Sequence, residues 1–224
     1  MRRSEVNSLI ERAVRFAGSY GFLLPPFAFW SPEEWRAKGH EADEIRDCML
    51  GWDLTDFGSG EFPRVGLLMF TIRNGHLTDT RYTKTYCEKM LMSEEKQITP
   101  MHFHWSKSED IIVRGGGRLA VQLYNSTPEE GLDTTDVTVS VDGVVRRVKA
   151  GGIVTLAPGE SIFLPRGLYH KFWGEGGKVL IGEVSTVNDD RTDNRFHEPV
   201  GRFPKMEEDE APRYLMFWEY PQAG

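Results

Sequence analysis

Four residues in two segments have the side chains and spacing of a metal site. His102 and His104 are separated by one residue in a β-rich run, so alternation along a strand places both imidazoles on one face. Glu109 follows a short turn that can bring its carboxylate back beside them, and His170 follows a Pro- and Gly-containing turn farther along the chain. Three imidazoles and a carboxylate suit a first-row divalent cation and leave coordination positions for water or a chelating substrate.

Short β-rich runs separated by Gly, Pro and Asp-Gly turns must position these residues. Strands are expected at residues 65–72, 81–90, 98–104, 110–113, 118–124, 137–141, 144–148, 153–156, 161–164, 169–173 and 178–184. Asp142-Gly143 predicts a two-residue hairpin between two of them. Many short strands of this kind predict a sandwich or barrel, and a jelly roll is one such arrangement.

The first 60 residues have a different pattern. Apolar residues recur at three-and-four spacing from Val6 to Ala17, which predicts an amphipathic helix with Ser4 as its cap. Ser31-Pro32 followed by two glutamates predicts a second, shorter helix. We therefore expect residues 1–60 to form a helical and extended segment that packs on the barrel, and residues 61–224 to form the β-barrel with a C-terminal extension.

The spacing of the four candidate ligands resembles the two motifs of the cupins. The motifs appear as His102-x-His104-x4-Glu109-x6-Gly116 and Gly159-x5-Pro165-x-Gly167-x2-His170. Lys96 stands where the first motif usually begins with Gly, and Gly174 stands where the second usually ends with Asn. Because neither position supplies a ligand, the resemblance implies a mainly β, cupin-type jelly-roll barrel with this metal site. It leaves the reaction open, since cupins include isomerases, dioxygenases, decarboxylases and binding proteins.

Longer segments resemble the D-lyxose isomerases over nearly the whole chain. The similarity lies in TPMHFHWSKSEDIIVRGGG (99–117), GEVSTVNDD (182–190), DNRF (193–196) and LPPF (24–27). It implies interconversion of D-lyxose and D-xylulose, often also of D-mannose and D-fructose. It also implies a divalent metal, typically Mn, although Co, Ni, Fe and Zn suit the same ligand types. The family's metal ligands carry over onto His102, His104, Glu109 and His170.

Aldose–ketose isomerisation moves hydrogen between C1 and C2, by proton transfer through a cis-enediol or by a hydride shift. The candidate catalytic groups are Lys107, Asp190 and Glu207, although a solvated lysine, an Asx turn and an exposed charge run explain the same residues without catalysis. Glu183 has a buried ion pair as its alternative. The residues expected to bind the sugar are Lys107, Glu109, Glu183 and Asp189.

Composition limits the partners. The formal charge of -7 does not favour nucleic acid or an anionic membrane surface. Cys48 and Cys87 fit neither a zinc-ligand spacing nor a disulfide framework, which indicates a reducing cytoplasm. No apolar run is long enough for a signal peptide or a transmembrane helix. We expect a small-molecule sugar as partner and, because cupins commonly pair, a homodimer. The alternatives are a cupin dioxygenase and a non-catalytic sugar-binding cupin.

Overall fold

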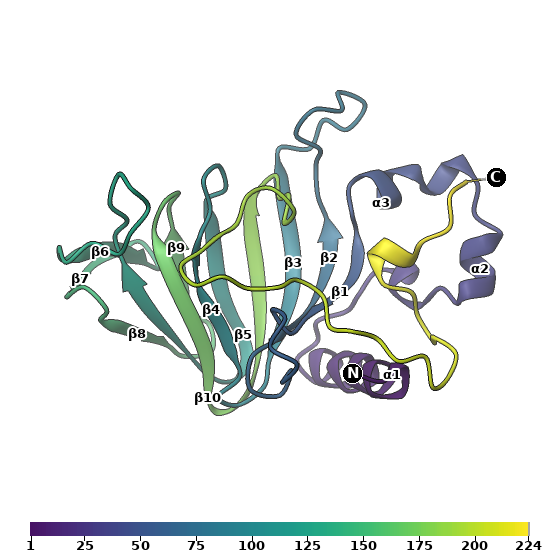
Figure 1. Cartoon of the computed structure of the whole chain (residues 1–224), viewed down its shortest axis with the longest axis horizontal. Helices are drawn as coiled ribbons and strands as arrows, with labels where there is room; N and C mark the ends of the chain where they lie inside the picture. Colours follow the sequence, from purple (N-terminus) through teal and green to yellow (C-terminus); the bar gives the residue numbers. More distant parts are fainter. Residues whose placement is uncertain (224) are drawn as a thin grey trace.

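The computed structural model describes residues 1–223. They form a β-barrel, and the helices lie beside its first strands (Figure 1). The strands are β1 (Gly51–Thr55), β2 (Leu67–Arg73), β3 (Tyr86–Ser93), β4 (Ile98–Phe103), β5 (Glu109–Tyr124), β6 (Val137–Val141), β7 (Val144–Val148), β8 (Ile153–Leu156), β9 (Ser161–Leu164), β10 (Tyr169–Thr186) and β11 (Arg195–Phe196). The α-helices are α1 (Arg3–Ser19), α2 (Pro32–Arg36) and α3 (Asp43–Asp47), and short 3-10 helices span Pro26–Phe29, His40–Ala42 and Phe217–Glu219.

Two long strands, β5 and β10, run through both layers of the barrel. Residues 109–116 of β5 pair with residues 179–185 of β10 in a layer ordered β1-β2-β3-β10-β5-β9-β6-β7. The other halves of the same strands pair again in a second layer, where β4 and β8 flank them. All the named strand pairs are antiparallel, so the predicted class, a mainly β barrel with an N-terminal helical extension, is confirmed.

Glycines bend these two strands. The sequence predicted a separate strand on each side of the Gly115–Gly117 and Gly174–Gly177 runs, and this was wrong, because the ladder continues through both. Gly116 has φ 91° and Gly177 has φ 129°, conformations that favour glycine, and the pairing register shifts at this level. The Asp142-Gly143 hairpin between β6 and β7 is confirmed, with φ 51° and 80° at the two turn residues.

Two apolar cores hold the barrel and the helices together. The inner core lies between the two layers and includes Ile111, Val121 and Ile181. The outer core packs the apolar face of α1 against the outside of β1, β2 and β3, where Trp52 and Phe70 are fully buried. The sheet therefore begins at β1, earlier than the boundary expected at residue 61, and the division into residues 1–60 and 61–224 stays a prediction.

The two predicted helix starts have different outcomes. Ser31 caps α2 and accepts a hydrogen bond from the backbone N–H of Glu34 at 3.1 Å, as expected. Ser4 is not the cap of α1, because the helix begins at Arg3 and Arg2 occupies the cap position. Ser4 instead donates its N–H and hydroxyl to the Asp209 carboxylate, at 2.9 and 2.6 Å. A hydrogen-bonded contact between Ser4 and Asp209, near the C-terminus, thus replaces the expected helix cap.

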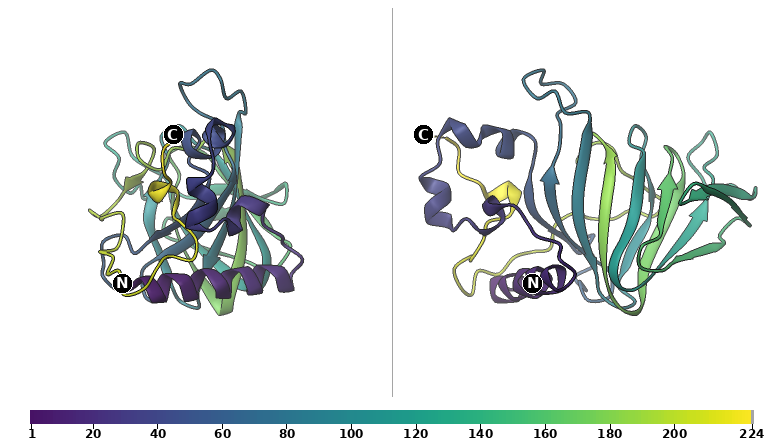
Figure 2. Two further views of the ribbon diagram at one scale, coloured as in Figure 1. Left: turned by 90° about the vertical axis from the view of Figure 1, so that its right-hand side faces the viewer. Right: turned by 180° about the vertical axis from the view of Figure 1, so that it is seen from behind.

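The chain after β10 returns across the barrel and ends beside the helices (Figures 1 and 2). Residues 201–213, which we call the strap, run from the barrel to α1. The backbone N–H of Arg3 donates to the carbonyl of Glu207 at 2.8 Å, and the Asn7 side chain donates to Glu210 and Ala211. No helix within residues 1–223 combines the length and apolar character needed to cross a membrane.

Candidate metal centre and pocket

Strand pairing brings three histidines together. His170, near the start of β10, lies directly opposite His102 on β4, and His104 follows the last residue of β4. One ring nitrogen from each histidine lies within 4.8 Å of those of the other two, and all three side chains are buried. The alternation argument from the sequence is confirmed for His102 and His104, and the fold adds the third imidazole from a distant segment.

Each imidazole is oriented by a backbone carbonyl. The Nδ1 atoms of His102, His104 and His170 lie 2.7, 2.8 and 3.0 Å from the carbonyls of Pro100, Asp193 and Leu168. A carbonyl only accepts hydrogen bonds, so Nδ1 carries the proton and Nε2 presents a lone pair. Burial, with the two neighbouring imidazoles, holds the pKa of His102 well below its usual range. Nε2 of His170 is buried and makes no hydrogen bond of proper geometry within residues 1–223, although Oε1 of Glu109 lies 3.1 Å away, as expected for an atom placed to bind a metal.

Glu109 completes the predicted set. It is the first residue of β5, and its Oε1 lies 3.1 Å from Nε2 of His170 and 3.5 Å from Nε2 of His104. Burial opposes the charge on this carboxylate, but Lys107 and His104 outweigh it and hold its pKa well below the usual range. Three imidazoles and a carboxylate, each oriented by neighbouring groups, are a donor set that fits a first-row divalent cation.

Lys107 links this carboxylate to a second one. Its Nζ lies 2.7 Å from Oε2 of Glu109 and 2.8 Å from Oε1 of Glu183. Burial would lower the pKa of Lys107, but these carboxylates outweigh burial and raise it well above its ordinary value. The turn that carries Lys107 is fixed by Asp193, whose carboxylate accepts the backbone N–H groups of Ser106 and Lys107 at 2.8 and 2.9 Å.

A second buried ion pair lies beside the first. Lys89 on β3 faces Glu183 across the β3–β10 ladder, with 3.7 Å between Nζ and Oε1, and donates to Oδ2 of Asp190 at 3.0 Å. Burial disfavours the Asp190 carboxylate, but Lys89 and Lys107 outweigh it and hold its pKa far below the usual range. Sequence reasoning missed Lys89. The available signal was a lysine in phase with Cys87 and Leu91, the inward positions of the same strand.

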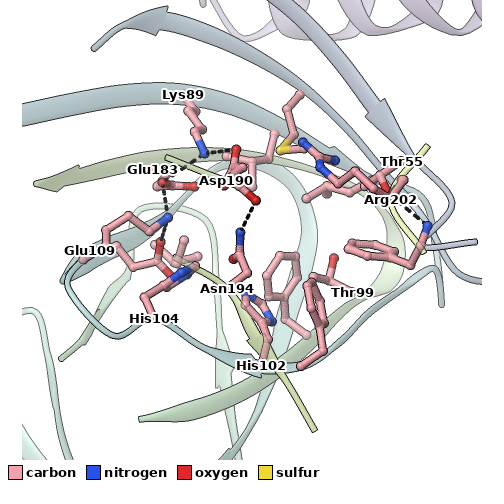
Figure 3. Close-up of a pocket in the computed structure, with 18 residues that line it drawn as sticks. Thr55, Lys89, Thr99, His102, His104, Glu109, Glu183, Asp190, Asn194 and Arg202 are labelled. Carbon is pink, nitrogen blue, oxygen red and sulfur yellow. Dashed lines mark hydrogen bonds and ion pairs between the residues drawn. The ribbon is translucent and has the colours of Figure 1, made fainter. Parts of the chain in front are cut away.

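One cavity, of about 550 Å³ including the space open to solvent, is lined by His102, His104, Lys107, Glu109, Lys89, Glu183 and Asp190. Figure 3 shows His102, His104 and Glu109 on one side of it, with Lys89, Glu183 and Asp190 above them and Arg202 with Thr55 across the pocket. The remaining wall is largely apolar and includes Phe57, Leu67, Met69, Leu91, Ile111, Phe172 and Phe196. A largely apolar cavity with a few convergent polar groups is typical of a small-molecule site.

Two predicted residues lie outside the cavity. The Asp189 carboxylate accepts hydrogen bonds from the backbone and side chain of Arg191, so it forms the Asx turn that was the alternative interpretation. Glu207 has an exposed side chain, and its backbone pairs with residues 1–3. The structure therefore supports neither the sugar-binding role expected of Asp189 nor the catalytic role expected of Glu207. Arg202, Asn194 and Thr55 line the cavity and were not predicted to do so.

The D-lyxose isomerase family model matches residues 1–220. The chain belongs to the D-lyxose isomerase family. A D-lyxose/D-mannose isomerase of Serratia proteamaculans is 48% identical, with 98% of each chain covered. One from Escherichia coli O157:H7 is 45% identical, with 99% of each chain covered. Membership of this family makes the chain a sugar isomerase, and the dioxygenase and binding-protein alternatives are set aside.

Solved structures of similar fold are more distant in sequence. The L-ribose isomerase of Cellulomonas parahominis in complex with L-ribose superposes with a TM-score of 0.59 at 15% identity, covering 92% of this chain and 98% of that one. The L-ribose isomerase of Acinetobacter sp. DL28 in complex with L-ribose gives 0.54 at 15% identity, covering 88% of this chain and 93% of that one. At these identities the likeness concerns the fold, which this member of the D-lyxose isomerase family shares with them.

Proposed function

We propose that this protein is a metal-dependent aldose–ketose isomerase that interconverts D-lyxose with D-xylulose and D-mannose with D-fructose. The observation that carries the proposal is the convergence of His102, His104, Glu109 and the Lys107–Glu183 pair on one cavity, with the His170 imidazole packed beside the other two. The names of the two relatives support the choice of sugars. We propose Mn²⁺ as the metal, because the resemblance to the family implies it and the donor set accepts it.

His102, His104, Glu109 and His170 would hold the metal. A divalent cation bound there supplies Lewis-acid stabilisation of negative charge on sugar oxygens. The apolar wall of the cavity excludes water, which strengthens every electrostatic interaction inside it. Thr99 lines the same wall, and its buried hydroxyl has no partner within residues 1–223, so it is available to a sugar hydroxyl.

Lys107 and Glu183 are the proposed proton-transfer pair. Glu183 takes the proton from C2 of the aldose and returns it to C1, while Lys107 gives a proton to O1 and takes the hydroxyl proton from O2, so that a cis-enediol lies between the two steps. Lys107 donates a hydrogen bond to the sugar oxygen on which negative charge develops. Lys89 holds the Glu183 carboxylate in place beside Asp190, because its Nζ lies within 4 Å of both carboxylates. This assignment moves the base role from Glu207 to Glu183.

The test measures conversion of D-lyxose and D-mannose by Mn²⁺-loaded protein before and after chelation. Chelation should abolish turnover, and restored Mn²⁺ should recover it. Glu183→Gln should lower kcat about 10²- to 10⁴-fold, the usual contribution of a general base. Glu88→Gln is the matched control, since Glu88 lies on the neighbouring strand and pairs with Arg73 at 3.0 Å, away from the cavity. A metal-loaded wild-type protein that converts neither sugar would refute the proposal.

The hydrogen-transfer route has its own readout. In D₂O, proton transfer through Glu183 should place solvent deuterium on the carbon that receives the proton, whereas a hydride shift retains the original hydrogen.

We also propose a homodimer in the cytoplasm. Sedimentation of the purified protein at two concentrations tests the dimer.

A further inference from the structure

A second chamber opens beside the cavity that contains the histidines. It measures about 1000 Å³, including the space open to solvent, and shares Asp190, Asn194, Phe196 and Arg202 with the first cavity as a common wall. Asp53 lines the second chamber and not the first. A molecule that places one end at the histidines and extends past Arg202 would therefore reach Asp53 with its other end.

Asp53 faces this chamber because of the alternation along β1. Trp52 and Leu54 point outward into the core under α1, so Asp53 and Thr55 point toward the interior of the barrel. The partners of Asp53 and Thr55 on β2 are Met69 and Leu67. Two polar side chains thus occupy inward positions on a strand whose neighbour contributes apolar ones.

One oxygen of Asp53 has a partner and the other has none. Oδ2 accepts a hydrogen bond from the Arg202 guanidinium at 2.5 Å. Oδ1 is buried and finds no hydrogen-bond partner within residues 1–223, and the residue as a whole is 4% exposed. Burial raises the pKa of Asp53, and Arg202 offsets only part of this effect. Buried polar atoms are nearly always hydrogen-bonded, and an acceptor left unpaired is costly. An acceptor of this kind beside a chamber indicates a ligand that donates to it.

We propose that Asp53, held by Arg202, accepts the terminal hydroxyl of an open-chain hexose, which a pentose is one carbon too short to present there, and so sets the preference between hexoses and pentoses. The inference rests on the proposed function, which places the carbonyl end at the histidines. A hexose extends one carbon farther than a pentose, and its terminal hydroxyl reaches farther into the second chamber. D-Mannose therefore depends on Asp53 more than D-lyxose does.

Kinetics of Mn²⁺-loaded wild-type and Asp53→Asn proteins test this inference. The substitution keeps the shape and the bond to Arg202 but presents an amide in place of the free oxygen. We expect kcat/KM for D-mannose to fall about tenfold, as when one hydrogen bond to a charged group is lost, while kcat/KM for D-lyxose stays close to the wild-type value. Asp56→Asn is the matched control. Asp56 is also buried, but its carboxylate accepts the backbone N–H groups of Gly58 and Gly60 and lines neither chamber. It should leave the mannose-to-lyxose ratio unchanged.

A substrate that lacks the terminal hydroxyl provides a second test, which does not depend on whether a variant folds. Wild-type protein should use 6-deoxy-D-mannose about tenfold less efficiently than D-mannose, because the deoxy sugar lacks the donor for Asp53, and Asp53→Asn should treat the two sugars alike. D-Mannitol, which cannot isomerise, should raise the melting temperature of the wild type more than that of Asp53→Asn. An equal loss on both sugars, or full use of the deoxy sugar by the wild type, would overturn the inference. A wild-type protein inactive on every sugar would instead overturn the proposed function.

Discussion

At the scale of single residues, the site is organised by charges that are buried with their partners. Glu109, Lys107, Glu183, Lys89 and Asp190 form a chain in which each cation lies between two carboxylates. Removing one partner of such a series leaves a buried charge without a counter-charge. The free energy of folding lost in this way is far larger than the stability that the ion pair contributes. The alternation of cations and carboxylates in this series therefore affects the free energy of unfolding as well as the proposed catalysis.

Lys89→Met should lower the free energy of unfolding by about 3–5 kcal/mol, because it leaves Glu183 and Asp190 without their shared cation. Urea denaturation of the variant and of the wild type measures the difference. Lys84→Met is the control, since Lys84 pairs with Glu44 at the surface, and its loss should be below about 1 kcal/mol. Similar small losses for both variants would show that the carboxylates find other partners when Lys89 is absent.

The sequence identified the ligands better than the charges around them. His102, His104 and Glu109 are near one another in the chain, so strand alternation and a short turn were enough to place them. Lys89 and Arg202 reach the cavity only through the β3–β10 ladder and the return of the strap. These contacts join distant segments, and no local pattern encodes them. The same reason explains Glu207, which pairs with the first residues of the chain instead of entering the cavity.

At the scale of elements, the strap and α1 hold each other through one buried cation. Arg3 is 2% exposed, and its guanidinium donates to Glu208 at 2.8 and 2.6 Å and to Glu219 at 2.5 Å. The strap also contains Arg202, whose carbonyl accepts a hydrogen bond from the Thr55 hydroxyl on β1. One end of the strap is therefore anchored at the cavity wall and the other on the helix.

Arg3→Met should loosen the strap without unfolding the barrel. We expect faster proteolysis between residues 201 and 213, and a higher KM for sugar because Arg202 loses its fixed position. Arg2→Met is the matched control, since Arg2 is adjacent in the chain but largely exposed and its side chain pairs only with Glu5 within residues 1–223. If both variants are cleaved at the wild-type rate, the buried cation does not hold the strap in place.

The sequence predicted single helices and strands correctly where one face of the element is buried and the other is exposed. The β6–β7 hairpin and the cap of α2 have such local signals and were predicted correctly. Strand β1 was missed because its inward residues, Asp53 and Thr55, are polar, and its apolar residues face the helices instead. That reversal places Thr55 in the cavity wall and Asp53 in the wall of the second chamber, so the strand hardest to assign from the sequence is one that lines the candidate site.

At the scale of the whole molecule, the two layers are joined by shared strands and closed around the apolar interior. Cys48 and Cys87 are fully buried, and burial raises the pKa of their thiols to about 11 and about 12. Both thiols are therefore protonated and inaccessible at pH 8, and only a transient opening of the structure exposes them.

Alkylation at pH 8 should therefore modify neither cysteine of the native protein in the time that denatured protein takes to react at both. Mass spectrometry of quenched samples counts the labels. Bound Mn²⁺ should slow labelling further if the metal stabilises the closed barrel, by an amount that grows with its concentration relative to its dissociation constant. Rapid reaction of one thiol in native protein would show that its part of the barrel opens independently.

The pairing of His170 with His102 would also determine when during folding a metal ion can bind at this candidate centre. These ligands meet only after β10 has closed on β4, a contact between segments separated by β5 to β9. Pairings of such long range form slowly, because closing the intervening loop costs entropy before the contact stabilises it. Capture of the cation should thus be a late event in refolding, and its appearance would mark the moment at which the two layers have joined.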